Sequence, residues 1–515
     1  MSVSRSVDII YTSDIHGYVF PLEYSDNSKA NKGLLRLLPA IRNFNSENRI
    51  LIDLGDSIQG SPLMYFHHLY NKDFDNPIST LLNHVNYDYF VPGNHDFNYG
   101  TDYLFKFVRD LKAKTLCSNI LDKKGNLLFE SGFEIKEFKN GVKVLIIGVT
   151  TKYIPNWENP QNIAGMAFLD AYEEPRKIVE KYKNEVDLIV CAYHGGLEKD
   201  LETGAEFVKN TGENQGYKIF ESIPEIDILL TGHQHRTLVY QKDNRVVMQP
   251  GSHGSKLGII HVDFSEDHSI EKIHPYFLEA KDFEVDLNDQ LLVQEVENAN
   301  QYFLDQIIGE VVEGDLEIKD SFLARRDKHP IVGFINDIQL KVTGAMLSST
   351  SLANVVSGFH KEITIRNVLS TYIYSNTLAV VEIDGKALRR YLEKCAEYFL
   401  IVDGEIVANP RFSYPKLEHY NYDMIDGIDY EFDLKKPFGN RVATVKYQGV
   451  EIKDTDIFTL ALNNYRAYGG GDFEMLRNLK IVKEIPFDVA ELLIDYIREH
   501  RLLHIKDKKN IILRK

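Results

Sequence analysis

Short apolar segments rich in β-branched residues recur through the first half of the chain, and each ends in a cluster of Asp, His, Asn or Gly. They lie at residues 7–12, 49–54, 142–150, 186–192 and 226–231. Near-continuous apolar segments of this length are typical of strands that are buried on both faces of a sheet. Between the first two, Leu34, Leu38 and Ile41 recur at the spacing of one helix face. This alternation predicts a layered α/β fold, in which ligands gather at the carboxyl ends of the strands.

The pattern changes near residue 276, where charged residues interrupt the apolar segments. The spacing of apolar residues from Leu292 to Ile307 predicts a helix that begins near residue 288 and ends at residue 308. The second half has its own alternating strand pattern at 377–383. We therefore expect two domains joined by a helix: an N-terminal domain at 1–278, a linker helix region at 279–308 and a C-terminal domain at 309–515.

Composition and charge narrow the classes of partner. Of the 515 residues, 43% are hydrophobic and 26% are charged, as in ordinary globular proteins. The 76 acidic and 59 basic residues give a net charge of −17. Proteins that bind nucleic-acid polymers or anionic membranes need clustered Lys and Arg, so we expect neither partner.

Cysteine usage and the N-terminus bear on the compartment. The three cysteines lie far apart, and the first residues lack the long apolar segment of a signal peptide. No apolar segment is long enough to span a bilayer. We therefore predict a cytoplasmic protein, whose oligomeric state the sequence leaves open.

Five polar clusters follow the strand-like segments or lie in the loops between them. They are Asp14-Ile15-His16, Gly55-Asp56, Gly93-Asn94-His95-Asp96, His194-Gly195-Gly196 and Gly232-His233-Gln234-His235. One such cluster alone is more often a turn or a helix cap, but the set predicts one shared location. Imidazole and carboxylate ligands suit manganese, zinc, cobalt or iron. Seven ligand-type residues are too many for one tetrahedral ion, so they suit two ions bridged by a carboxylate, for which Asp56 is the natural candidate.

Two metal ions about 3.5–4 Å apart are the arrangement that enzymes use for displacement at phosphorus. A water shared by the ions loses a proton and attacks phosphorus, while both ions stabilise the charge on the phosphate oxygens. The clusters thus predict a phosphoester hydrolase.

In this order, the five clusters resemble those of the calcineurin-like metallophosphoesterases. The resemblance implies a set of ligands for each ion: Asp14, His16, Asp56 and His235 for one, and Asp56, Asn94, His194 and His233 for the other. His95 matches a catalytic histidine of that family, which is not a ligand but contacts the phosphate and assists the leaving oxygen.

A narrower resemblance covers nearly the whole chain. Residues 55–62 are similar to those of the two-domain 5′-nucleotidase family. This implies an N-terminal metallophosphatase four-layer β-sandwich flanked by helices, a linker helix and a C-terminal α/β nucleotide-binding domain. Residues 93–100, 420–427 and 463–470 resemble the branch of bacterial 2′,3′-cyclic-nucleotide 2′-phosphodiesterase/3′-nucleotidases.

Asn98 bears on the choice between branches. The 5′-nucleotidases and UDP-sugar hydrolases usually have Asp here, which orients the catalytic histidine and favours its charged form. Asn98 can orient His95 but has no charge with which to stabilise an imidazolium. We interpret it as favouring the cyclic phosphodiesterase branch, in which Asn98 acts beside His95.

The second domain contains the candidate base site. Tyr468 and the glycines at 469–471 form an aromatic–glycine loop, in which a ring can stack on a base. Tyr422 is the candidate for the opposite ring, and Asn354 and Arg466 are candidates for contacts to sugar or phosphate. Core tyrosines and a structural ion pair of Arg466 are the alternatives.

We therefore predict a dinuclear-metal hydrolase that acts on 2′,3′-cyclic nucleotides and 3′-nucleotides by attack of metal-bound hydroxide on phosphorus. One alternative is a 5′-nucleotidase or UDP-sugar hydrolase, and another is a non-catalytic scaffold or binding protein. Seven polar groups that converge on one spot argue against the scaffold, because burying them without a function is costly.

Overall fold

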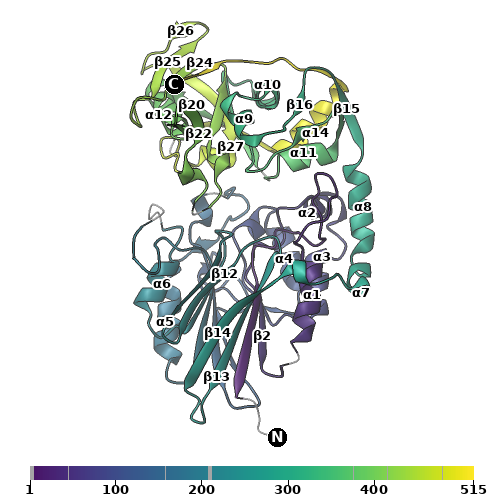
Figure 1. Cartoon of the computed structure of the whole chain (residues 1–515), viewed down its shortest axis with the longest axis vertical. Coiled ribbons are helices and arrows are strands. Elements are labelled where there is room, and N and C mark those ends of the chain that lie inside the picture. The colour runs from purple at the N-terminus through teal and green to yellow at the C-terminus, as the bar shows by residue number, and fades with distance from the viewer. Residues whose placement is uncertain are drawn as a thin grey trace. The chain divides into compact units, whose positions relative to one another are not determined.

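Figure 1 shows the computed structural model of the chain, which describes residues 5–44, 46–156, 158–206, 212–374, 376–414, 416–477 and 479–515. The chain divides into two compact units, Met1–Asn300 and Gln301–Lys515. The division lies inside the region 279–308, where the sequence predicts the link. No helix in the described part of the chain combines the length and apolar character needed to cross a membrane.

Unit 1 contains two six-stranded sheets. The order of the first is β14 (Ile270–Glu279), β13 (Lys256–Phe264), β1 (Ser6–Thr12), β2 (Arg49–Asp53), β3 (Tyr89–Phe90) and β4 (Lys114–Thr115). The order of the second is β11 (Thr237–Lys242), β12 (Arg245–Pro250), β10 (Ile228–Thr231), β9 (Leu188–His194), β7 (Lys143–Thr150) and β6 (Phe133–Glu137). β1 to β4 run parallel, as do β7, β9, β10 and β12, so their carboxyl ends share one edge of each sheet. The five predicted strands are confirmed as β1, β2, β7, β9 and β10.

The two sheets pack face to face, and helices cover their outer faces (Figure 1). One buried cluster includes residues of both sheets: Ile9, Ile52, Val190 and Ile228. A second cluster joins the outer face of the second sheet to two helices, α5 (Glu173–Tyr182) and α6 (Gly216–Ser222). On the other side lie α1 (Leu34–Asn43), α3 (Pro77–His84) and α4 (Thr101–Asp110). There, Phe107 of α4 contacts Phe90 of β3. This arrangement confirms the predicted four-layer sandwich.

The helix predicted at 288–308 differs from the structure. Two helices replace it, α7 (Leu287–Leu291) and α8 (Gln294–Leu304), and the chain then forms β15 (Ile307–Glu313). β15 pairs with β19 (Glu362–Thr364) and β29 (Leu502–His504), which satisfies backbone groups that a helix would have paired internally. The prediction of its C-terminal end was wrong because one apolar residue after a helical pattern fits a strand equally well.

Unit 2 is built on a five-stranded sheet. Its order is β23 (Asp423–Asp426), β17 (Leu347–Ser351), β27 (Ile457–Asn463), β20 (Thr377–Asp384) and β28 (Lys480–Asp488). β20 confirms the strand predicted at 377–383. Two helices, α12 (Gly385–Ala396) and α14 (Val489–His500), begin directly after strands, and the carboxylates of Asp384 and Asp488 cap them. This sheet with its helices confirms the predicted α/β class of the C-terminal half.

Candidate metal centre

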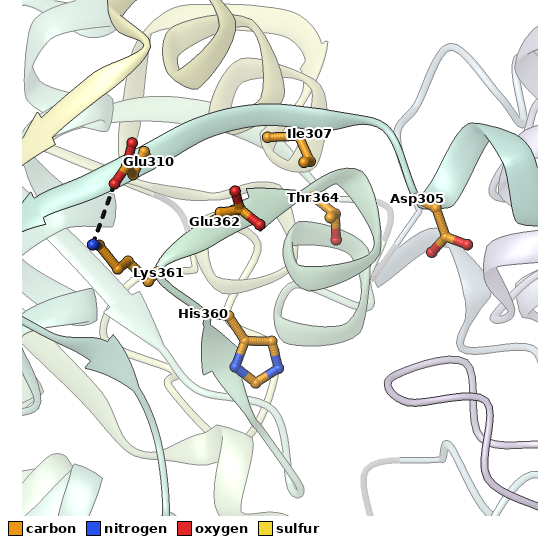
Figure 2. A pocket seen from close by; sticks show the side chains of 7 residues that line it. All are labelled: Asp305, Ile307, Glu310, His360, Lys361, Glu362 and Thr364. Carbon is orange, nitrogen blue, oxygen red and sulfur yellow. Dashed lines mark ion pairs between the residues drawn. The ribbon is translucent and has the colours of Figure 1, made fainter.

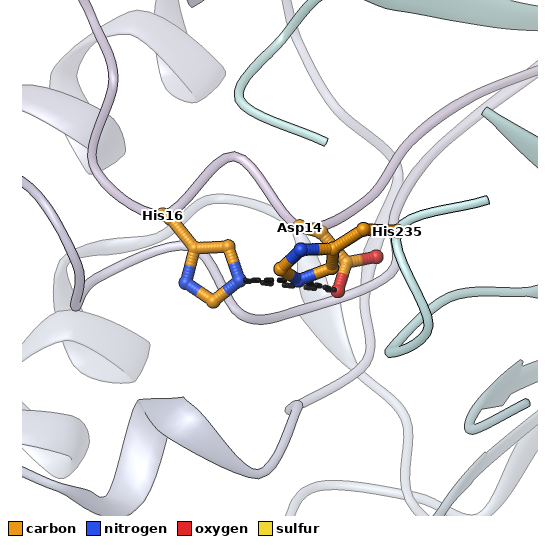
Figure 3. A group of neighbouring side chains, drawn as sticks. All are labelled: Asp14, His16 and His235. Carbon is orange, nitrogen blue, oxygen red and sulfur yellow. Dashed lines mark hydrogen bonds and ion pairs between the residues drawn. The ribbon is translucent and has the colours of Figure 1, made fainter. Parts of the chain in front are cut away.

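Two groups of metal-ligand side chains lie in unit 1 at the carboxyl ends of parallel strands. The first is Asp14, His16 and His235 (Figure 3), and the second is Asp56, His194 and His233. Within each group, one ligand atom per residue lies within 4.8 Å of the others. Asp14 and His16 follow β1, and His235 follows β10. The parallel strands therefore bring together residues that lie far apart in the sequence of the domain.

The first group directs two imidazole nitrogens and a carboxylate oxygen to one point (Figure 3). The Nε2 atoms of His16 and His235 are 3.0 Å apart, and Nε2 of His235 is 3.4 Å from Oδ1 of Asp14. Nδ1 of His16 is 2.9 Å from the carbonyl oxygen of Gln59, which holds the ring. Burial and the charge of His235 lower the pKa of His16 to about 3. The His16 ring is therefore neutral at pH 7, which is the form that binds a divalent cation.

The second group includes the side-chain oxygen of Asn94. Nε2 of His194 is 3.1 Å from Oδ2 of Asp56 and 3.2 Å from Oδ1 of Asn94. Nδ1 of His233 is 2.8 Å from the same Asn94 oxygen. The structure therefore brings all of the predicted ligands into two neighbouring groups of nitrogen and oxygen donors, which fit divalent metal ions.

Asp56 lies between the two groups. Its Oδ2 is 3.1 Å from Nε2 of His194 in the second group and 3.9 Å from Nε2 of His16 in the first. Oδ1 accepts a hydrogen bond from the backbone N–H of His95 at 2.7 Å, whereas the buried Oδ2 lacks a well-aligned one within the described part of the chain. Burial acts to raise the pKa of Asp56, but the charges of His194 and His95 hold it well below its usual range. A buried, charged oxygen in this place fits a bridge between two cations.

Five of these residues have a backbone conformation that L-amino acids rarely adopt. The angle φ is 54° at Asp14, 51° at His16, 54° at Asp56, 68° at His233 and 58° at His235. Such residues cost on the order of 1–3 kcal/mol each and persist where the surrounding structure determines them, which is common at functional sites. The strain therefore supports a functional role for these turns.

We expect Gly55→Ala to weaken both the fold and the metal centre. Gly55 has φ of 79°, and a Cβ atom there would lie 2.2 Å from the backbone nitrogen of Gly93 and 2.5 Å from the carbonyl oxygen of Val91. Because both contacts are to backbone, the loops that contain Asp56 and Asn94 would have to separate. We expect a loss of at least about 2 kcal/mol in the free energy of unfolding. Thermal unfolding and titration with Mn²⁺ measure the two effects.

Gly125→Ala is the matched control for this variant. Gly125 has φ of 82°, but a Cβ atom there would meet nothing within 4 Å. It introduces the same conformational strain without the clash. Equal losses of stability and of Mn²⁺ affinity in the two variants would contradict the importance of the close approach at Gly55.

His95 lies beside the two groups, and its ring belongs to neither group of ligand atoms in the described part of the chain. Its ring centroid is 5.2 Å from that of His16. Nδ1 of His95 is 2.8 Å from Oδ1 of Asn98. This hydrogen bond fits the predicted role of Asn98 in orienting His95, and both catalytic roles stay predictions.

Three carboxylates that hold the site were not found by sequence reasoning. Oε1 of Glu213 is 2.8 Å from Nε2 of His233, and Oε2 of Glu158 accepts from Nδ2 of Asn98 at 2.6 Å. Such carboxylates orient the rings and amides that they contact. The third, Asp96, accepts four backbone hydrogen bonds from the loops after β2 and β3, at Asp56, Ser57, Ile58 and Gly93. Asp96 could have been identified from the sequence, because it lies in the same polar cluster as His95. Glu158 and Glu213 lie in irregular segments, where no sequence pattern points to them.

Arg466 is buried in unit 2 and joins two of the predicted substrate segments. Its guanidinium forms a bidentate pair with Asp423, at 2.7 and 3.0 Å, and donates to the carbonyl oxygen of Tyr420 at 3.1 Å. These contacts hold residues 420–427 beside 463–470. They correspond to the structural ion pair that the sequence left open as an alternative.

Tyr422 differs from the expectation for a stacking ring. Its side chain is fully buried and stacks on Tyr398, with centroids 4.8 Å apart and planes 18° apart. Because a base needs an exposed ring face, this packing argues against a stacking role for Tyr422. Tyr468 is half-buried, and Nδ2 of Asn354 donates to the carbonyl oxygen of Leu417 at 2.9 Å. Contacts of these two residues to substrate stay predictions.

Unit 2 also has an open pocket of about 610 Å³ (Figure 2). Its lining includes Asp305, His360 and Glu362, together with Lys361, which pairs with Glu310 at 3.5 Å. Within the described ranges, these side chains form no group of ligand atoms close enough to hold a metal ion. The lining includes none of the four predicted substrate residues, so this pocket is not the predicted site.

Two family models match the chain. The model of the calcineurin-like phosphoesterases matches residues 7–237, and the model of the 5′-nucleotidase C-terminal domain matches residues 308–478. A solved structure of a proposed 5′-nucleotidase from Staphylococcus aureus, in complex with alpha-ketoglutarate, is 32% identical, with a TM-score of 0.93. That match covers 99% of this chain and 100% of the other.

Two curated bacterial proteins match at lower identity. The 2′,3′-cyclic-nucleotide 2′-phosphodiesterase/3′-nucleotidase of Haemophilus influenzae is 25% identical over 95% of this chain and 84% of its own length. The trifunctional nucleotide phosphoesterase protein YfkN of Bacillus subtilis is 26% identical over 98% of this chain, which spans 38% of YfkN. Since both halves match their family models and the likeness to the Staphylococcus aureus structure runs from end to end, the chain belongs to the two-domain 5′-nucleotidase family, with a calcineurin-like phosphoesterase domain followed by a 5′-nucleotidase C-terminal domain.

Proposed function

We propose that this protein hydrolyses nucleotide phosphoesters with the aid of two divalent metal ions, and that its substrates are 2′,3′-cyclic nucleotides and 3′-nucleotides. The observation on which the proposal rests is Asp56, whose buried Oδ2 lies between two groups of ligand side chains. The likeness to the Haemophilus influenzae protein and the presence of Asn98 beside His95 support this substrate class.

The proposed ligands divide between two ions: Asp14, His16, Asp56 and His235 for one, and Asp56, Asn94, His194 and His233 for the other. Their nitrogen and oxygen donors suit manganese, zinc, cobalt or iron. When bound, two such ions activate water and stabilise the charge that develops on the phosphate oxygens. Glu213, hydrogen-bonded to His233, would keep that ring in the orientation that presents Nδ1.

His95 acts on the leaving oxygen in this proposal. Because Nδ1 is held by Oδ1 of Asn98, Nε2 is the ring nitrogen that can give a hydrogen bond or a proton to the substrate. On a 2′,3′-cyclic nucleotide the 2′-oxygen leaves phosphorus and the product is a 3′-nucleotide. On a 3′-nucleotide the 3′-oxygen leaves, and the products are a nucleoside and phosphate.

Residues 309–515 supply the base site in this proposal, after the metal domain at 1–278 and the linker at 279–308. Tyr468, beside three consecutive glycines, would stack on the base, and Asn354 would contact the sugar. Arg466 and Tyr422 are buried, so we assign them the task of holding the loops of this site.

Phosphate release in the presence of Mn²⁺ tests the proposed function. The panel is 2′,3′-cyclic AMP, 3′-AMP, 5′-AMP and UDP-glucose, with an auxiliary phosphatase where the product is still a phosphate ester. We expect the highest kcat/KM for the first two. A protein that releases phosphate from none of the four, with Mn²⁺, Zn²⁺ or Co²⁺ in turn, would contradict the hydrolase.

5′-Nucleotidase activity is the second candidate. It is favoured by the Staphylococcus aureus structure, which is that of a proposed 5′-nucleotidase and matches this chain over 99% of its length. A preference for 5′-AMP or UDP-glucose would select it. That result would leave the proposed metal ions and the fold unchanged. It would also show that Asn98 does not determine the substrate.

A further inference from the structure

Behind His95, a chain of hydrogen bonds ends on a buried carboxylate. Nδ1 of His95 meets Oδ1 of Asn98 at 2.8 Å, and Nδ2 of Asn98 donates to Oε2 of Glu158 at 2.6 Å. Oε1 of Glu158 accepts from the backbone N–H of Asn159 and from Nδ2 of Asn162, both at 2.8 Å. Three donors therefore hold both oxygens of Glu158, which is 5% exposed.

The carboxylate determines the direction of each hydrogen bond in this chain. A carboxylate accepts hydrogen bonds and cannot donate them, so the end of the Asn98 amide that faces Glu158 is the NH₂ group. The other end, Oδ1, then faces His95 as an acceptor. It requires a proton on Nδ1 of His95 and leaves Nε2 for the substrate.

Glu158 remains a good acceptor in spite of its burial. Burial raises the pKa of its carboxyl, and the hydrogen bonds from Asn162, Asn98 and Asn159 reduce that rise without reversing it. All three present N–H groups to the carboxyl, and an N–H group cannot accept a hydrogen bond from a protonated carboxyl, so this surrounding suits a carboxylate, two hydrogen bonds away from the imidazole. In a buried network such a charge polarises each bond along the chain.

We propose that Glu158 is a positioning residue for His95, which acts through Asn98 to keep one proton of His95 on Nδ1, so that the proton given to the leaving oxygen comes from Nε2 and the ring is left neutral with its Nδ1 proton. The inference rests on the proposed function, in which His95 assists that oxygen. An amide alone can present either end to His95, and Glu158 removes that choice. It also supplies the negative charge that Asn98 lacks.

Glu158→Gln tests this role because it replaces one carboxylate oxygen with an NH₂ group and keeps the shape of the side chain. The amide oxygen is expected to occupy the place of Oε1, where Asn159 and Asn162 both donate, so the new NH₂ group faces Asn98. Asn98 must then turn its own NH₂ group toward Nδ1 of His95. We expect kcat on 3′-AMP to fall about ten- to a hundredfold. KM, metal content and melting temperature should stay close to those of the wild type.

Asn98→Asp distinguishes positioning from packing. Alone, it sets a carboxylate oxygen against Oε2 of Glu158 at a spacing of 2.6 Å, and the repulsion should lower kcat at least as much. In the double variant Asn98→Asp/Glu158→Gln, the new amide donates to the new carboxylate, which still accepts from Nδ1 of His95. Every hydrogen bond is satisfied again, so we expect kcat at least about tenfold above that of either single variant.

A second substrate and a control variant complete the test. p-Nitrophenyl phosphate has a leaving group that needs little assistance, so Glu158→Gln should lose less activity on it than on 3′-AMP. Glu198→Gln is the matched control: Glu198 is 3% exposed, and its oxygens accept from the backbone of Tyr217 and Lys218, outside the chain to His95. We expect its kcat to be unchanged.

The outcomes separate this inference from the proposed function. If 5′-AMP proves the better substrate, the same variants are compared on it, because its leaving oxygen is also an alkoxide. Three outcomes would overturn the role of Glu158 and leave the proposed function standing, provided that the wild-type protein is active. They are an unaffected Glu158→Gln variant, equal losses on both leaving groups, and a double variant that is no more active than the single variants. A wild-type protein that hydrolyses none of these esters would overturn the proposed function and this role with it.

Discussion

Asp56→Asn is expected to abolish stable metal binding at the centre and to lower kcat/KM for nucleotide hydrolysis by at least about a thousandfold, because the lost charge stabilisation is worth several kcal/mol. Oδ2 of Asp56 is 3.1 Å from Nε2 of His194 and 3.9 Å from Nε2 of His16, so one carboxylate serves both groups. An amide would keep an acceptor for the backbone N–H of His95 but would remove the negative charge that is proposed to serve two ions. The loss should therefore affect both proposed ions together.

Metal content by mass spectrometry, after dialysis against limiting Mn²⁺, measures this loss alongside activity on 3′-AMP. Asp53→Asn is the matched control, because Asp53 is equally buried and ends β2 three residues earlier. Burial raises the pKa of Asp53 to about 7. Its oxygens accept hydrogen bonds from the hydroxyls of Thr12 and Ser57, and a hydroxyl can instead accept a hydrogen bond from the NH₂ group of an asparagine. An Asp56→Asn protein that still held two ions and hydrolysed normally would exclude the bridge.

The ligand groups could be predicted because they follow buried parallel strands. The apolar segments identify β1, β2, β9 and β10, and a polar cluster ends or follows each of these strands. Once such strands run parallel, their carboxyl ends share one edge, whatever the loops between them do. For this reason Oδ1 of Asp14 lies 3.4 Å from Nε2 of His235, although the two residues come from distant parts of the domain's sequence.

The residues behind the ligands could not be predicted in this way. Glu158 lies in an irregular segment, and its partner Asn98 is 60 positions away in the sequence. A hydrogen bond between two loops depends on the path of each loop, which no periodicity encodes. Tyr422 shows the same limit for aromatic residues, since a tyrosine that faces a base and one that packs on Tyr398 follow the same local pattern. The early end of the linker helix likewise depends on the strands that pair with β15.

His95→Ala is expected to lower kcat on 3′-AMP by about a hundred- to ten-thousandfold and to leave metal binding intact. The ring of His95 belongs to neither ligand group in the described part of the chain. Its hydrogen bond to Asp56, at 2.7 Å, comes from the backbone N–H, which alanine keeps. The loss should therefore appear in the departure of the leaving oxygen and not in the binding of either ion.

The leaving group makes this prediction specific to His95. Activity on p-nitrophenyl phosphate should fall much less in His95→Ala, because its leaving group departs without a proton, whereas Asp56→Asn should lose activity on both esters alike. His261→Ala, which removes a ring paired with Asp8 and Asp263, is the control and should keep full kcat. Full kcat of His95→Ala on 3′-AMP would mean that another group assists the leaving oxygen. A fall that is equal on both esters and accompanied by metal loss would mean that His95 supports the ions instead.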